Sequence, residues 1–333
     1  MAETNTKGAF WGFEVRSRQL AGTWVISPYF PPPSEKTASW FMGGNQSPGA
    51  TSIVDRITYA SDTNAATSRG SLSGASSSNN ATGSLNFGWI ALAQSPSDTT
   101  NIDRITYASD SNISVLRGNL NRLKRNVSSV TDSINYGWFG GGRIPATPFY
   151  ISEVSRLSFS DDTTTTVLRG SLAFIADRRA ATSNDTYGWF GGGYSSPAPG
   201  ERSFVNRIEY STDTDTASIR GSLTRAILSL AATGNQTYGW FAGGTNPGAS
   251  AFSNISRITY ATDTAVAVDR GLLSVNNSTF AASGNQTYGW FGGGTGYKST
   301  VDRVTYSDDT TTASIRGTLS AGRIAFTSSS GIQ

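Results

Sequence analysis

Hydrophobic and polar residues alternate with a period of two in two short strings that recur along the chain. One string surrounds a tryptophan, as in TYGWFGGG, and the other reads RITY or a close variant. Such alternation, in segments rich in Thr, Ile, Tyr and Trp, predicts β-strands. No stretch of the sequence approaches the roughly 18 continuous apolar residues of a membrane-spanning helix. The pattern therefore predicts an all-β protein.

The tryptophan string occurs six times, at steps of 49, 49, 51, 51 and 50 residues. Each copy is followed by the second string and then by Arg-Gly-x-Leu. The second arginine lies 13 positions after the first, and an aspartate lies six positions after the first arginine. The repeated residues are Trp40, Trp89, Trp138, Trp189, Trp240 and Trp290, and Asp62, Asp110, Asp162, Asp213, Asp263 and Asp309. This period indicates a repeat architecture.

Each unit has room for four strands, named A to D in chain order. In the fifth copy we expect them at about 226–233, 237–243, 257–260 and 265–271. Turns are expected at Gly234-Asn235 and Asp263-Thr264, because Asn and Asp side chains can accept hydrogen bonds from their own backbone. Four antiparallel strands repeated six times predict a six-bladed β-propeller, since each blade can bury its faces only against its neighbours.

The order of these strings resembles the kelch repeat, which is also about 50 residues long and forms β-propellers. The resemblance rests on Leu-x-x-Arg, Ala-x-x-Gly, Tyr, Gly-Gly and an aromatic residue that ends strand C, and it covers about residues 37–333. Blade 2 departs from it, because Ile90-Ala91-Leu92-Ala93 replaces the glycines. The resemblance implies a kelch-like propeller with four antiparallel strands per blade.

The chain thus divides into a short N-terminal arm, residues 1–36, and a ring, residues 37–333. Blades 2 to 6 are expected at 73–120, 121–172, 173–223, 224–273 and 274–319. Strand A is missing before Trp40, where Pro31-Pro32-Pro33 interrupts the chain, and a surplus strand pattern follows Leu319. We therefore expect residues 320–333 to complete blade 1 and close the ring. The aromatic arm either packs on the ring or anchors the chain to another subunit.

The 333 residues include no cysteine and no histidine. Their absence removes disulfides, the usual zinc and copper ligands, and Ser-His or Cys-His catalysis. Carboxylate-pair glycosidase chemistry stays open on the non-repeated acids Glu153, Asp177 and Glu201, although no spacing singles them out. We expect a non-enzymatic protein with no catalytic residues, metal or cofactor.

Residues that recur in every blade are more often architectural than ligand contacts. We expect the six tryptophans to fill the core between blades, rather than to form a carbohydrate-stacking ladder. The six aspartates are expected to form Asx-turns and hydrogen bonds to the arginines of strands C and D. Ligand contact by these aspartates is the alternative.

The connection between strands B and C varies, because the distance from the tryptophan to the first arginine ranges from 13 to 18 residues. A rigid scaffold usually carries function in its loops, so we expect a binding face formed by the B–C and D–A connections. Its candidate residues are Arg143, Phe149, Tyr150, Tyr194, Arg202, Phe204, Tyr297 and Lys298. A second basic set is expected around the channel and its loops, at Arg122, Arg125, Arg178, Arg179, Arg225 and Arg323. The alternative is that these bases are only solvated.

The strings YGWFGGG and DRITYASDT also resemble repeat-rich virion proteins of marine bacteriophages. This resemblance implies a structural virion protein, associated with a tail or fibre and assembled in the host cytoplasm, that presents its binding face to a bacterial surface glycan or protein. Other virion proteins would contact it, with residues 1–36 as one anchor. The balance of 26 basic and 23 acidic residues predicts neither nucleic-acid binding nor membrane insertion, and no signal peptide is expected. A cellular kelch-type adaptor for protein partners is the alternative.

Overall fold

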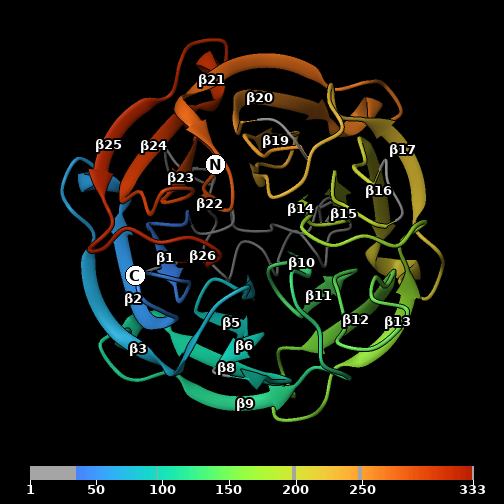
Figure 1. Ribbon diagram of the computed structural model, residues 1–333, viewed down its shortest axis with the longest axis horizontal. Helices are drawn as coiled ribbons and strands as arrows, with labels where there is room; N and C mark the ends of the chain where they lie inside the picture. Colours follow the sequence, from blue (N-terminus) through green and yellow to red (C-terminus); the bar gives the residue numbers. More distant parts are fainter. Residues whose placement is uncertain (1–34, 96, 197–199, 247–249, 332–333) are drawn as a thin grey trace, which may run out of the picture. The chain divides into compact units, whose positions relative to one another are not determined.

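The computed structural model describes residues 35–331 apart from 96, 197–199 and 247–249. These residues form six four-stranded antiparallel sheets, arranged as the blades of a ring (Figure 1). The predicted six-bladed propeller is confirmed. Within the described part of the chain, no helical segment has the length and apolarity that crossing a membrane requires.

The strands of each blade run in order from the innermost to the outermost. Blade 1 contains β26 (Thr327–Gly331), β1 (Ala38–Met42), β2 (Thr51–Thr58) and β3 (Thr67–Ser76). Blade 2 contains β4 (Asn80–Gly83), β5 (Phe87–Ala91), β8 (Asn101–Thr106) and β9 (Val115–Asn119). Blade 3 contains β10 (Ser128–Thr131), β11 (Tyr136–Gly140), β12 (Glu153–Ser158) and β13 (Val167–Ser171).

Blade 4 contains β14 (Ala180–Ser183), β15 (Tyr187–Gly191), β16 (Phe204–Glu209) and β17 (Ser218–Ser222). Blade 5 contains β18 (Ala231–Gly234), β19 (Tyr238–Ala242), β20 (Phe252–Thr259) and β21 (Val268–Asn277). Blade 6 contains β22 (Ala281–Gly284), β23 (Tyr288–Gly292), β24 (Thr300–Thr305) and β25 (Ser314–Thr318).

The second strand of each blade is buried on both faces because a neighbouring blade packs against each of them. In β19, every residue after Tyr238 is buried. Glycine is needed at such positions: a Cβ on Gly239 would lie 2.6 Å from Cγ2 of Thr182 in the preceding blade. The hydrophobic core therefore lies between blades, as in the cluster that joins Trp189 and Val205 of blade 4 to Phe241 and Ile258 of blade 5.

The C-terminal strand closes the ring, as predicted. β26 pairs antiparallel with β1, from Ala38 opposite Gly331 to Met42 opposite Thr327. The segment before β26 is anchored by Arg323, whose Nη2 donates to Oδ2 of Asp55 at 3.0 Å, and both side chains are fully buried. Blade 1 therefore combines strands from both ends of the described chain.

Strand bounds in the fifth copy differ from the expected ones. The inner strand begins at Ala231 instead of 226, because Leu228 belongs to the D–A connection and pairs with Thr245 of the B–C connection. β20 and β21 extend to Phe252 and Asn277, which pair with each other beyond the regular blade.

The glycine pair after strand B turns the chain away from the blade in five of the six described blades. Gly141 and Gly142 have φ of +65° and +101°, values that disfavour side chains, and the equivalent glycines of blades 1, 4, 5 and 6 agree. In blade 2, Leu92 and Ala93 lead instead into a short hairpin of β6 (Gln94–Ser95) and β7 (Ser97–Asp98). The departure seen in the sequence is therefore a different loop on an unchanged sheet.

Candidate functional site

The repeated tryptophans, arginines and aspartates form six contacts between neighbouring blades, which we call inter-blade latches. In the first, Asp110 of blade 2 accepts hydrogen bonds from Trp40 Nε1 at 2.7 Å, Arg56 Nη1 at 3.1 Å and Arg69 Nε at 2.7 Å, all from blade 1. The last latch joins Asp62 of blade 1 to three residues of blade 6: Trp290, Arg303 and Arg316.

This arrangement corrects the expectation for the aspartates. The repeat pattern predicts Asx-turns and bonds to arginines between strands C and D, but each carboxylate instead accepts from the preceding blade. Burial acts to raise the pKa of Asp162, but hydrogen bonds from Arg117 and Trp89 outweigh it, so that pKa lies below its ordinary value. Spacing within one repeat could not reveal a bond that crosses to the next.

Each tryptophan also stacks on the aromatic residue that directly follows the third strand of the next blade. The rings of Trp290 and Tyr59 lie 3.8 Å apart and nearly parallel, at 2°. The other pairs are Trp40–Tyr107, Trp89–Phe159, Trp138–Tyr210, Trp189–Tyr260 and Trp240–Tyr306. The six tryptophans are at most 1% exposed, so they form inter-blade core, as predicted.

Isolated β-bridges, outside the four strands of each blade, hold the backbone of the variable loops. In blade 3, Arg143 follows the glycine pair and bridges to Arg125 on one side and to Tyr150 on the other. In blade 4, Tyr194 holds the same place between Asp177 and Glu201. The residue after the glycine pair is therefore held by similar backbone contacts in both blades, while its side chain differs.

Blades 3 and 4 bring four candidate residues together, and we call Arg143, Tyr150, Arg178 and Tyr194 the Tyr–Arg ledge. The rings of Tyr150 and Tyr194 lie 5.8 Å apart at 68°, edge to face. The Arg178 guanidinium lies 5.3 Å from the centre of the Tyr194 ring, and its Nε donates to Asp177 at 3.2 Å. Arg143 is the β-bridge partner of Tyr150, so the two residues are direct neighbours in the loop.

Arg143 differs from the other arginines of the ledge region. Its side chain is half-buried, and its guanidinium makes no hydrogen bond or ion pair with any residue that the structure describes. Arg125 is paired with Asp98 at 2.7 Å, and Arg178 with Asp177. The ledge therefore combines one unpaired guanidinium, on the bridge partner of Tyr150, with the pair of rings of Tyr150 and Tyr194.

The other residues predicted for the binding face lie apart from the ledge or have partners already. Phe149 is 52% exposed and precedes Tyr150, whereas Phe204 packs against Phe174 at 5.6 Å. Arg202 donates to Ser195 Oγ at 2.9 Å. In blade 6, Tyr297 is exposed, and Lys298 Nζ donates to the carbonyl oxygens of Asn276 and Thr295.

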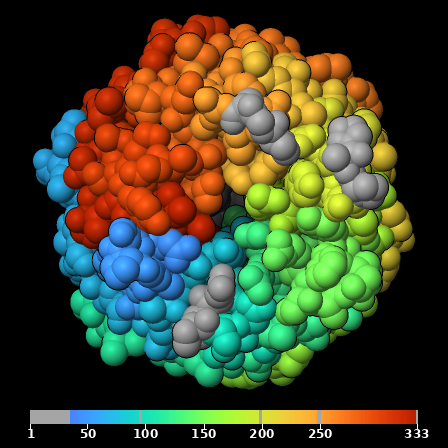
Figure 2. All heavy atoms as spheres, in the orientation of Figure 1, coloured from blue at the N-terminus to red at the C-terminus, as the bar shows by residue number. Residues whose placement is uncertain are grey.

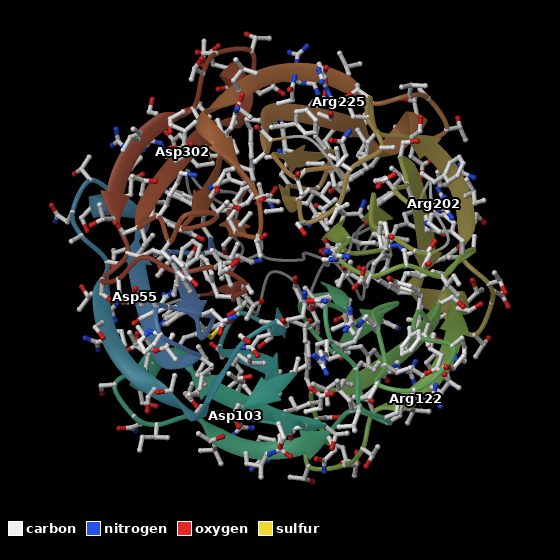
Figure 3. All side chains as sticks on the ribbon, viewed as in Figure 1. Asp55, Asp103, Arg122, Arg202, Arg225 and Asp302 are labelled. Carbon is white, nitrogen blue, oxygen red and sulfur yellow. The ribbon has the colours of Figure 1, made fainter. Side chains whose placement is uncertain are left out.

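The second basic set lies in the D–A connections, before the strands that surround the channel. The strands nearest the centre of the ring carry no charged residue, and all six bases precede them in the chain (Figure 1). Figure 2 shows a hollow at the centre of the ring, and Figure 3 places Arg122, Arg202 and Arg225 toward the outer strands. Arg122 pairs with Glu153 at 2.8 Å and Arg225 reaches Asp269 at 3.9 Å, while Arg179 and Arg323 are buried.

Two of the three non-repeated acids, Glu153 and Asp177, pair with basic residues. Glu153 pairs with Arg122 and lies 3.5 Å from Lys124, and the buried Asp177 accepts from Asn126 and Arg178. Glu201 lies in the ladder beside Tyr194. In the part of the chain that the structure describes, no group of three or more acidic residues is placed to hold a metal ion.

Sequence reasoning missed a polar position that anchors the D–A connections. The residue before the first arginine accepts from the incoming chain: Asp55 from Ser320 N, Asp103 from Ser73 N and Asp302 from Ser274 N (Figure 3). Sequence reasoning also missed Phe174, whose ring packs against that of Phe204, and the exposed Ile175 that follows it in the chain. Phe174 occupies the place of Arg122 and Arg225, two residues after the repeated leucine, and this substitution was the signal that could have found it.

No protein-family model and no curated protein sequence matches this chain. The structure itself establishes a six-bladed β-propeller, and such a fold is consistent with a binding or structural role.

Proposed function

We propose that the chain is a non-enzymatic structural and binding protein of a bacteriophage virion, associated with its tail or fibre, that contributes to attachment on the bacterial surface. The observation that carries the binding role is the contrast between the two kinds of position in the ring. Six equivalent latches hold the blades, whereas the residues above the glycine pairs differ from blade to blade. Variable side chains on a rigid scaffold favour recognition.

The Tyr–Arg ledge is the part of the loop face best suited to a partner. The unpaired guanidinium of Arg143 favours an anionic group, and the rings of Tyr150 and Tyr194 offer flat apolar contact. An exposed contact of this kind contributes on the order of 1 kcal/mol, so firm attachment requires several chains to bind together. A repeated virion component would supply that multivalency.

The partners proposed are a bacterial surface glycan or protein on the loop face and other virion proteins elsewhere. The predicted anchor in residues 1–36 falls almost entirely outside the described residues, which begin at Glu35. The virion assignment rests on the resemblance of YGWFGGG and DRITYASDT to phage virion proteins.

The binding role is tested by attachment of the fluorescently labelled full chain to a panel of marine bacteria. We expect binding to at least one strain, and we expect Arg143→Ser with Tyr194→Ser to reduce it several-fold. Gln236→Ser with Gln286→Ser is the control, because these exposed residues lie in the A–B turns on the opposite face. Loss of attachment in the control pair alone would contradict the proposal and place the binding site on the face of the A–B turns. Labelling of purified phage particles by an antibody against this chain tests the virion assignment.

A cellular adaptor is the second candidate, and the packed pair Phe174–Phe204 favours it. Phe204 and Ile175, which follows Phe174 in the chain, are 45% and 42% exposed, and exposed apolar side chains are typical of a protein contact. If Phe204→Ser abolishes attachment and Arg143→Ser leaves it unchanged, the apolar surface around Phe204 is the binding site, and the Tyr–Arg ledge is not.

A further inference from the structure

We propose that the Tyr–Arg ledge binds a sugar ring that carries a carboxylate, such as a uronic acid residue. This inference rests on the proposed attachment function and names the chemical class of the ligand. It assigns the carboxylate to Arg143 and the face of the sugar ring to the corner formed by Tyr150 and Tyr194.

The backbone of Arg143 is fixed, so its side chain starts from a defined position when it binds a carboxylate. Its backbone exchanges two hydrogen bonds with Arg125, at 2.8 and 2.9 Å, so the base of the side chain is fixed on the ladder. The planar guanidinium can donate two parallel hydrogen bonds to one carboxylate. Because no described residue accepts from it, binding would not require an existing ion pair to break.

The charges around Arg143 leave it as the cation available to a ligand. Asp98 neutralises Arg125, and Asp177 neutralises Arg178. Another acid, Glu201, is the β-bridge partner of Tyr194 in the ladder of blade 4. A single small anion is therefore favoured at Arg143, whereas a polyanion that extended past Tyr194 would meet Glu201.

The two tyrosines form a corner with one apolar face and one polar edge. The 68° angle between their rings places the edge of one against the face of the other, which leaves ring surface for the C–H groups of a sugar. Burial raises the pKa of Tyr150, so its hydroxyl stays protonated at neutral pH and can donate to a sugar hydroxyl.

The test is a titration of the full chain with sodium glucuronate, glucose, glucose 6-phosphate and the acidic peptide acetyl-Glu-Tyr-Glu-amide, followed by NMR. We expect glucuronate to bind at least tenfold more tightly than glucose, which has a hydroxymethyl group in place of the carboxylate. Arg143→Gln should weaken glucuronate binding about tenfold, since it removes charge-assisted hydrogen bonds. Arg143→Lys should recover only part of the affinity, because an ammonium group lacks the planar fork.

Arg122→Gln is the matched control, because Arg122 is already paired with Glu153 and lies toward the outer strands (Figure 3). It should leave glucuronate binding unchanged. Equal binding of glucose and glucuronate, or tighter binding of glucose 6-phosphate or the peptide, would overturn the assignment.

The two proposals can fail separately. If Arg143→Ser lowers attachment to bacteria while glucuronate does not bind, the loop face is functional and the ligand class is wrong. If glucuronate binds through Arg143 but no bacterial strain depends on this residue, the ligand class holds and the attachment function fails.

Discussion

Lys124 is a buried basic residue of blade 3. Its side chain is fully buried, and its Nζ donates to Ser155 Oγ at 2.6 Å. Burial lowers its pKa to about 8, and the nearby Glu153 only partly opposes this shift. The native state therefore favours the neutral amine more than the unfolded chain does.

The free energy of unfolding should consequently depend on pH through Lys124. A lysine of the unfolded chain binds its proton up to about pH 10.4, so between pH 8 and pH 10 the unfolded state holds more protons than the native state. Stability from this group should thus rise by roughly 2 kcal/mol over that interval. Urea unfolding of the natural chain and of a variant without Lys124, at several pH values, isolates this contribution as the difference between the two proteins.

Lys124→Met is the matched variant for this measurement, since it keeps the length of the side chain and removes the titrating group. Its stability should lack this rise, so the stability difference between the two proteins should change by roughly 2 kcal/mol from pH 8 to pH 10. The buried tyrosines act in the opposite sense as the pH approaches and passes 10, because burial raises the pKa of Tyr59 to about 12, and they do so equally in both proteins. Identical slopes in the two proteins would show that Lys124 does not titrate in this range.

At the scale of the element, the inter-blade latch is the unit that the repeat encodes. The glycine after the second arginine belongs to it, because the neighbouring C–D turn lies against its Cα. A Cβ on Gly317 would lie 1.9 Å from the carbonyl oxygen of Asn64, and Gly317 N donates to Asp62 O at 2.7 Å. Blade 6 can approach blade 1 this closely only with glycine at the position.

Gly317→Ala should therefore destabilise the protein by about 2–3 kcal/mol, the usual cost of forcing an extra methyl group into a packed contact. The measurement is the melting temperature by calorimetry. Gly49→Ala is the control, because no atom lies within 4 Å of its Cβ position. A melting temperature for Gly317→Ala equal to that of Gly49→Ala would mean that the blades are not packed tightly at this junction.

The whole molecule depends on its closure between blade 6 and blade 1. β26 gives blade 1 its inner strand, and the buried pair Arg323–Asp55 fixes the segment that leads into it. A propeller without this strand would expose the edge of β1 and leave the buried carboxylate of Asp55 unpaired.

Deletion of residues 321–333 should therefore lower the melting temperature sharply or cause aggregation. Deletion of residues 1–33 is the comparison, because it removes no strand of the described sheets. Light scattering and thermal unfolding of both truncated chains measure the effect. The closure would be dispensable if the chain that ends at residue 320 melted like the full chain and stayed monomeric.

The sequence alone determined the architecture, because every blade repeats the same local pattern. Period-two alternation, Gly-Asn turns and the 50-residue step predict strands and blades without long-range information, and the missing strand before Trp40 predicts the closure. The sequence also singled out Arg143, Tyr150 and Tyr194 as variable loop residues.

Only the tertiary structure decided what these side chains contact. The aspartates bond the preceding blade and not their own, because the ring places each C–D turn against the neighbouring arginines. Of the bases predicted around the channel, Arg323 is buried in the closure and Arg178 joins the ledge. Arg143, which was predicted for the binding face, has no ion-pair partner among the described residues. Spacing along the chain specifies which residue types recur, whereas pairing across blades depends on distances that only the closed ring sets.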